Sequence, residues 1–188
     1  MRIGVDIGGT KIEAVAIDED LAVLASYRAP VRPGPEGIRA GTLQAIDEVR
    51  SAADVTPSSI GVGAPGATRG GVLRHARNIN VVRLDLEAEI ARATGACVRV
   101  GNDVNAAALG AWSVRGDDSQ SLAYLNLGTG MAAGIVLHGR VWPGARGVAG
   151  EIGYLSVDRS GPDHVAGLPG TLEAYASGSG VVAQWGVD

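Results

Sequence analysis

The sequence predicts an α/β fold made of two lobes of related design. Short apolar runs of strand type alternate with segments of helical periodicity. Two strand pairs are each joined by a turn that contains glycine and threonine, at Gly8-Gly9-Thr10-Lys11 and again at Gly128-Thr129-Gly130. The return of this arrangement in the second half of the chain indicates an internal repeat, and hence two lobes.

The first lobe is predicted to contain five strands and three helices. The expected strands are 3–7, 12–17, 21–27, 59–63 and 97–100, of which the first three should form an antiparallel meander. Apolar residues recur at roughly helical spacing from Ile38 to Val49. Asp85 and Gly95 are of the types that begin and end a helix, here over 86–94. The Ala-rich segment 104–114 predicts a third helix, whose small side chains would let a neighbouring element approach closely.

The polar segment from Arg115 to Ser121 marks the expected lobe boundary, which gives lobes of residues 1–114 and 115–188. The second lobe should begin with strands 122–127 and 131–138, and Thr171 should cap a helix over 172–177. This lobe has too few residues to match the first and to cover both faces of its sheet. We therefore expect it to be incomplete.

Composition narrows the class of partner. The chain has 16 basic and 20 acidic residues, a net charge of −4 and no basic run, which argues against nucleic acid and favours small molecules. It shows no signal-peptide pattern or membrane-spanning apolar stretch, so we expect a cytoplasmic protein without a membrane partner. Cys97, the one cysteine, is expected to be a small buried hydrophobic residue, and zinc-ligand spacing is missing.

The first turn, Gly8-Gly9-Thr10-Lys11, has the groups needed to bind phosphate. It offers backbone N–H groups, a hydroxyl and a cation, and Lys11 is the only lysine in the chain. The alternative is a tight hairpin in which glycine supplies a positive φ. Asp6, close before the turn, is unusual in a strand and could orient a magnesium-bound water, with a surface carboxylate at a strand end as the alternative.

Later in the chain, Gly128-Thr129-Gly130 would be a second phosphate-binding turn, because hairpin geometry gives no reason for threonine in both turns. Asp103 follows a strand and begins a helix, where it could act as a base or simply cap the helix. Glu151 and Glu173 flank glycine-rich loops and could accept hydrogen bonds from sugar hydroxyls. The helix macrodipole would favour Glu173 at its position whatever the function.

Six motifs in order resemble the ROK family of sugar kinases and related regulators, over essentially the whole chain. They are Val5-Asp6-Ile7-Gly8-Gly9-Thr10-Lys11, Gly63-Ala64-Pro65-Gly66, Gly101-Asn102-Asp103-Val104-Asn105-Ala106-Ala107, Leu127-Gly128-Thr129-Gly130, Gly150-Glu151-Ile152-Gly153 and Leu172-Glu173-Ala174-Tyr175-Ala176-Ser177-Gly178. The resemblance implies the two-lobed actin-like ATPase (ribonuclease H-like) fold, with its second lobe incomplete here.

The resemblance also implies a reaction, the transfer of the γ-phosphoryl group of ATP to a hydroxyl, usually the 6-hydroxyl, of a hexose or N-acetylhexosamine. Asp103 would be the general base. Asp6 and the first turn would serve the nucleotide phosphates and Mg²⁺, with the second turn as another phosphate segment. Asn102, Glu151 and Glu173 would bind sugar hydroxyls, and Gly66 would line the pocket.

Three departures from the family pattern matter. Tyr154 replaces the usual histidine, and His164, Ala166 and Thr171 replace a cysteine cluster, so we expect no structural zinc and a hydrogen-bonding role for Tyr154 near the sugar. Ala132 and Ala133 stand where glycines are common. Family members also continue past residue 188 through an adenosine-binding segment, so the chain should be an N-terminal part with little activity alone.

A non-catalytic sugar-binding or regulatory protein is the main alternative, and it would retain Asn102, Glu151 and Glu173. A transcriptional repressor is less expected, because DNA-binding helices ahead of the first strand are missing from this sequence. A dinucleotide oxidoreductase is not favoured, because the first turn lacks the pattern G-x-G-x-x-G. The identity of the sugar and the oligomeric state, including a homodimer, are left open.

Overall fold

The computed structural model describes all residues of the chain except 55, 116–117, 164–166 and 187–188. The chain divides into two compact units, Met1–Asp103 and Val104–Asp188. Helix α3 (Asp103–Val114) therefore belongs almost wholly to the second unit, whereas the predicted lobes place it in the first. The lobe boundary after residue 114 stays a prediction.

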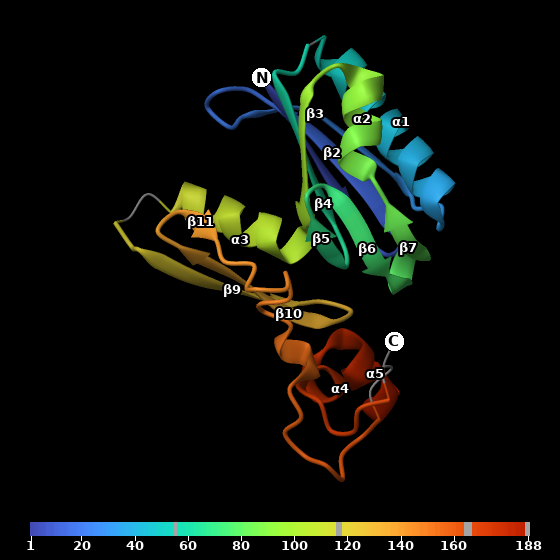
Figure 1. The fold of residues 1–188 in the computed structure, drawn as a ribbon, viewed down its shortest axis with the longest axis vertical. Coiled ribbons are helices and arrows are strands. Elements are labelled where there is room, and N and C mark those ends of the chain that lie inside the picture. Colours follow the sequence, from blue (N-terminus) through green and yellow to red (C-terminus); the bar gives the residue numbers. More distant parts are fainter. Residues whose placement is uncertain (55, 116–117, 164–166, 187–188) are drawn as a thin grey trace. The chain divides into compact units, whose positions relative to one another are not determined.

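The first unit is built on a five-stranded sheet with the strand order β3-β2-β1-β4-β8 (Figure 1). These strands are β1 (Arg2–Ile7), β2 (Lys11–Ile17), β3 (Val23–Pro30), β4 (Ser59–Ala64) and β8 (Cys97–Asn102). The predicted antiparallel meander of β1, β2 and β3 is confirmed, and β4 runs parallel to both β1 and β8. The carboxyl ends of β1, β4 and β8 consequently lie at the same edge of the sheet.

Two helices, α1 (Pro35–Ala53) and α2 (Leu86–Thr94), lie side by side against this sheet (Figure 1). Proline suits the first turn of α1, because the N–H that it lacks has no partner within the helix there. The predicted caps of α2 are confirmed. The Asp85 side chain accepts a hydrogen bond from Ala88 N, and Gly95 ends the helix in the left-handed conformation at φ 69°.

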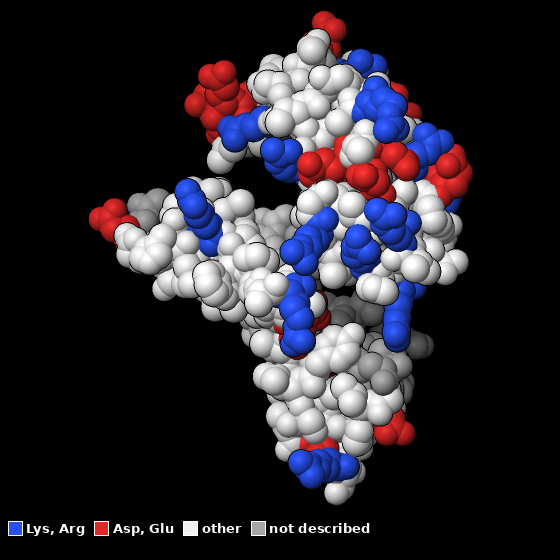
Figure 2. Space-filling model, viewed as in Figure 1, with Lys and Arg blue, Asp and Glu red and all other residues white. Residues whose placement is uncertain are grey.

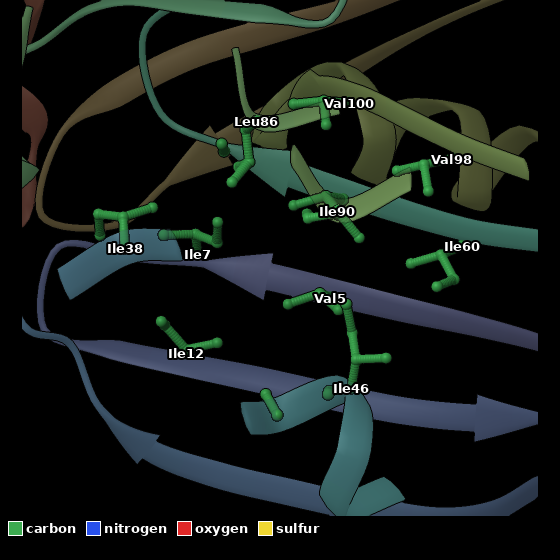
Figure 3. Packing of buried hydrophobic residues seen from close by; sticks show 14 of the residues in the cluster. Val5, Ile7, Ile12, Ile38, Ile46, Ile60, Leu86, Ile90, Val98 and Val100 are labelled. Atoms are coloured by element: carbon green, nitrogen blue, oxygen red, sulfur yellow. The ribbon is translucent and has the colours of Figure 1, made fainter. Parts of the chain in front are cut away.

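The main hydrophobic core lies between the sheet and these helices. Alternate residues of β1 and β2 point toward it, as Figure 3 shows for Val5, Ile7 and Ile12, which pack near Ile38 and Ile46 of α1. All five side chains are buried. Because side chains alternate between the faces of a strand, the polar residues of β1 and β2 lie on the opposite face of the sheet.

The prediction of a buried Cys97 is wrong, because this residue is exposed. Strand β8 buries Val98 and Val100, which occupy alternate positions and face the core. The two-residue period of the strand then directs Cys97 to the other face. The apolar composition of the segment gave no indication of which face each residue would take.

A second, three-stranded sheet in the first unit was not predicted. It consists of β5 (Ala67–Arg69), β6 (Val72–Ala76) and β7 (Val81–Leu84), with the 3₁₀ turn η1 (Arg77–Ile79) between the last two. These strands are short, and Leu73 and Ile79 join the main core. The sheet brings Asn78 of η1 close to the first glycine turn.

The described residues of the second unit form the sheet β11-β10-β9 and several helices. Its elements are α3, β9 (Ser121–Leu127), β10 (Met131–Leu137), β11 (Arg140–Val141), the 3₁₀ turn η2 (Ile152–Tyr154), α4 (Leu172–Ala176) and α5 (Gly178–Trp185). The predicted cap is confirmed, because Thr171 Oγ1 accepts a hydrogen bond from Ala174 N at 3.2 Å. The predicted close approach to α3 is also found, at Gly134 of β10, where an added Cβ would lie 2.5 Å from Ala108 Cβ.

Among the described residues, none of the helices is both long and apolar enough to cross a bilayer. Figure 2 shows basic and acidic side chains mixed on the visible face of the molecule. This mixture is typical of an ordinary solvated protein surface.

Candidate functional site

Three of the sequence motifs meet at the carboxyl edge of the main sheet. Asp6 lies near the end of β1 and pairs in register with Gly63 of β4, while Ala64 of β4 pairs with Asn102 of β8. Asp103 follows directly and begins α3. In α/β sheets this edge commonly carries ligand-binding groups, and here the parallel order β1-β4-β8 collects residues that are far apart in sequence.

The predicted sugar-binding residues Gly66 and Asn102 are in contact. Asn102 Nδ2 donates a hydrogen bond to Gly66 O at 3.3 Å, which ties the loop after β4 to the end of β8. Gly66 has a φ of 90°, and an added Cβ would lie 2.8 Å from Arg74 O. Glycine is therefore required at this position by both conformation and space.

Asp6 lies in a negatively charged environment. It is directly opposite Glu13 in the β1–β2 pair, and the carboxylate of Asp103 also acts on it. As a residue Asp6 is exposed, yet partial desolvation of its carboxyl group, followed by the charges of Asp103 and Glu13, raises its pKa, while Lys11 opposes the rise. Carboxylates that repel one another in this way would be relieved by a bound cation.

Lys11 occupies the base of the first turn. Its Nζ lies 2.9 Å from Glu13 Oε2, and Arg28 Nε lies 3.4 Å from the other oxygen of that carboxylate. The hydrogen bond from Lys11, together with the two positive charges, lowers the pKa of Glu13. The ion pair holds the ammonium group at the turn, on the face of the sheet opposite the core.

A positive φ does not explain the glycines of the first turn, although a Cβ on Gly8 would lie as close as 3.3 Å to Lys11 O. Gly8 N donates to Lys11 O at 2.8 Å, but neither Gly8 nor Gly9 has a positive φ, so the alternative in which glycine supplies that conformation is wrong. A Cβ added to Gly9 would lie 3.6 Å from Asn78 Nδ2, which is an ordinary contact. The lack of a side chain, which lets a ligand approach the backbone closely, remains a physical reason for glycine at position 9.

The second turn has the same property. Gly128 N donates to Gly130 O at 3.0 Å, and neither glycine has a positive φ. A Cβ on Gly128 would have its nearest neighbour 4.0 Å away, at Asn126 Nδ2, whereas a Cβ on Gly130 would lie 2.7 Å from Glu173 Oε2. Packing therefore explains Gly130 but not Gly128.

The structure joins Glu173 to this turn. Glu173 Oε2 accepts a hydrogen bond from Met131 N at 2.7 Å, immediately after the turn. A Cβ on Gly153 would lie 3.1 Å from the same oxygen, so η2 packs against Glu173. Glu151 precedes η2 and Tyr154 ends it, and both are exposed. The predicted sugar residues of the second unit thus gather near the second turn.

Two of the positions predicted to replace a zinc site, His164 and Ala166, lie outside the described residues. Within the described part of the chain, no group of three His, Cys, Asp or Glu residues is placed to hold a metal ion. Sequence reasoning missed Asn78, which lies beside Gly9, and Ser179, which contacts the second turn. Neither residue stands out in the sequence, because Asn and Ser are common in turns and caps.

Comparison with known proteins gives matches along nearly the whole chain. The family described as the ROK family matches residues 2–187. Glucokinase from Streptomyces coelicolor is 32% identical over 185 residues, which cover 97% of this chain and 58% of the glucokinase. The chain thus spans less than two thirds of the length of this curated relative.

Solved structures with the actin-like ATPase fold also match. A ROK family glucokinase from Streptomyces griseus, in complex with glucose and AMPPNP, has a TM-score of 0.85 and 33% identity, covering 97% of this chain and 59% of that one. A ROK family transcriptional regulator, a homologue of the E. coli MLC protein, has a TM-score of 0.86 and 28% identity, covering 97% and 48%. The chain has the α/β fold of these proteins over the part that it covers, and it belongs to the ROK family.

Proposed function

We propose that the protein is an ATP-dependent sugar kinase that phosphorylates a hexose or N-acetylhexosamine, most simply at the 6-hydroxyl. The observation that carries this proposal is the position of Asp103 at the carboxyl edge of the sheet, directly after Asn102, which contacts Gly66. The glucose and AMPPNP bound in the Streptomyces griseus relative support a sugar and a nucleotide as substrates.

Asp103 is proposed to accept the proton of the attacking hydroxyl. As the sugar oxygen forms its bond to the γ-phosphorus, the bond from that phosphorus to the bridging oxygen of ADP breaks. The proton passes to the Asp103 carboxylate, and Asn102 and Gly66 hold the sugar beside it. Asp103 is only partly buried, as a base that must meet a small ligand needs to be.

The two glycine turns are proposed to bind the nucleotide phosphates through backbone N–H groups. Asp6 fits a role beside Mg²⁺, because a carboxylate is a hard oxygen ligand and its raised pKa reflects partial desolvation followed by the negative charges of Asp103 and Glu13. In kinases Mg²⁺ uses one or two carboxylates together with phosphates and waters, so three protein ligands are not required. When bound, Mg²⁺ would neutralise phosphate charge.

Sugar-dependent release of ADP tests the proposal. The 188-residue chain and the full product of its gene are each assayed with ATP and Mg²⁺ and with glucose, N-acetylglucosamine or N-acetylmannosamine. We expect turnover by the full product and little by the chain alone. 6-Deoxyglucose is the matched control, because it lacks the acceptor oxygen. ADP release that is equally fast with 6-deoxyglucose, or that does not respond to any sugar, would contradict the proposal.

The second candidate is a non-catalytic sugar-binding or regulatory protein. The similarity to the ROK family transcriptional regulator favours it, because the TM-score of that structure is 0.86 and that of the glucokinase is 0.85. Calorimetric titration separates the two functions. A regulator should bind its sugar with the same affinity in the presence and absence of AMPPNP and Mg²⁺, and it should release no ADP.

A further inference from the structure

The segment Ser177–Ser179, which we call the strap, bonds to the second glycine turn through the backbone oxygens of that turn. Gly178 N donates to Gly128 O at 2.8 Å. Ser179 donates to Thr129 O twice, from its backbone N at 3.2 Å and from Oγ at 2.7 Å. Two consecutive carbonyl groups of the turn are therefore fixed by one short stretch of chain.

The strap itself is held firmly. Ser177 is buried, and its Oγ accepts a hydrogen bond from Gly180 N at 3.1 Å, so it caps α5. A Cβ on Gly178 would lie 3.0 Å from Gly128 O, which means that a side chain there would force the turn to move. Glycine at position 178 thus permits the close approach of the strap to the turn.

These contacts fix the direction of the N–H groups in the turn. The described residues contain no cis peptide bond, and in a planar trans peptide the N–H points opposite to the preceding C=O. With Gly128 O and Thr129 O directed at the strap, the N–H groups of Thr129 and Gly130 must point away from it. Two neighbouring N–H groups with a shared direction form a cradle for an anion.

We propose that the strap, through Gly178 and Ser179, is a positioning device that aims the N–H groups of Thr129 and Gly130 at a nucleotide phosphate. The inference rests on the proposed kinase function. Glu173 completes the arrangement, because it accepts the next N–H along the chain, that of Met131, at 2.7 Å and so holds the residue that follows the turn. Ser179 acts through the turn and is a positioning residue.

Binding of AMPPNP to the full gene product, measured by calorimetry, tests the strap. Ser179→Ala removes one of the two bonds to Thr129 O, together with the 3.0 Å contact between the Ser179 and Ser177 hydroxyls inside the strap. It should raise the dissociation constant about 2- to 10-fold, the usual effect of one hydrogen bond. Ser179→Thr keeps the hydroxyl and should bind AMPPNP normally. Ser156→Ala is the matched control, because its Oγ also donates to a backbone carbonyl of the second unit, Pro169 O, but outside the turn.

Gly178→Pro is a stronger variant. Proline is favoured at the first position of a helix, and Ser177 is already extended, as a residue before proline prefers. The variant should keep α5 but lose the bond to Gly128 O and push the turn away, so AMPPNP affinity should fall by more than in Ser179→Ala. Sugar affinity should fall by less than AMPPNP affinity in both variants, because the strap bonds directly to the phosphate turn.

Hydrogen exchange of the amides of residues 128–131 is measured in the same variants, and should be faster in Gly178→Pro than in Ser156→Ala. Unchanged AMPPNP affinity in both strap variants would overturn the inference and leave the kinase proposal standing. Equal losses of AMPPNP and sugar affinity would overturn it as well, since that pattern indicates general damage. A wild-type protein that neither binds AMPPNP nor phosphorylates sugars would refute the kinase proposal, and the positioning role with it.

Discussion

At the scale of single residues, the negative charge around Asp6 is the feature that function explains best. Strand β1 places Asp6 opposite Glu13, and β8 brings Asp103 to the same edge of the sheet. Directly opposed like charges destabilise a sheet. Repulsion between these carboxylates lowers the stability of the fold. It is easiest to understand at a site that binds a cation or a cationic complex.

The raised pKa of Asp6 makes a prediction about stability. A carboxyl group with a higher pKa in the folded than in the unfolded protein favours folding when protonated and disfavours it when ionised. Asp6→Asn, which is always neutral, should therefore raise the melting temperature at pH 7 by less than about 4 °C, the shift that 1 kcal/mol produces at this chain length.

The gain should disappear as the pH falls below the unfolded pKa of about 3.8. Asp20→Asn, at an exposed position, is the control and should leave the melting temperature unchanged at both pH values. Melting curves followed by circular dichroism at pH 7 and pH 3 provide the measurement. A lower melting temperature for Asp6→Asn at pH 7 would mean that the ionised group stabilises the fold.

Residues with a local physical role could be predicted from sequence, whereas those that depend on long-range contacts could not. The caps at Asp85 and Thr171 were predicted, because capping depends on neighbours three residues away. The exposure of Cys97 and the place of Asn78 beside Gly9 depend on strand register and on a sheet far along the chain. No local pattern carries that information.

At the scale of elements, the contact between α3 and β10 shows why small residues recur in this chain. Gly134 of β10 faces Ala108 and the backbone oxygen of Val104, with no room for a methyl group. Gly110 of α3, by contrast, has open space where a Cβ would be added. The two glycines therefore have opposite roles, one required by packing and one that only weakens a helix.

Alanine substitutions distinguish these roles. Gly134→Ala should lower the free energy of unfolding by about 1–3 kcal/mol, because the added methyl overpacks the contact with α3. Gly110→Ala should raise it by about 0.5–1 kcal/mol through improved helix propensity. Chemical denaturation of the two variants measures both changes. Stabilisation by Gly134→Ala would show that α3 does not pack against β10 as described.

The predictability of the elements follows from their length. The paired strands around the two glycine turns are apolar runs, α1 has helical periodicity and α2 is marked by its capping residues, and all were predicted. The sheet of β5, β6 and β7 was missed, because its strands have only three to five residues and include charged side chains. Its stability comes from contacts with the main core that periodicity does not show.

At the scale of the whole molecule, the predicted site residues are divided between the two units. Asp6, the first turn, Gly66, Asn102 and Asp103 belong to the first unit. The second turn, Glu151, Tyr154 and Glu173 belong to the second. The repeated turn predicts two lobes from the sequence, and the boundary after residue 114 stays a prediction. The contact of α3 with β10 depends on small residues far apart in the chain, which no sequence pattern specifies.

The central claim is that Asp103 is the general base and not merely a helix cap. Asparagine caps a helix as well as aspartate does, so a capping role predicts that Asp103→Asn is neutral. Asp85→Asn is the matched control, because Asp85 caps α2 in the same unit. The comparison isolates the charge and the proton affinity of the side chain.

The decisive measurement is the sugar-dependent kcat of these two variants in the full gene product, together with their sugar dissociation constants. We expect Asp103→Asn to lose about 100-fold or more in kcat, the usual contribution of a general base, while it binds the sugar normally. Asp85→Asn should retain wild-type turnover. Normal turnover by Asp103→Asn would contradict the account.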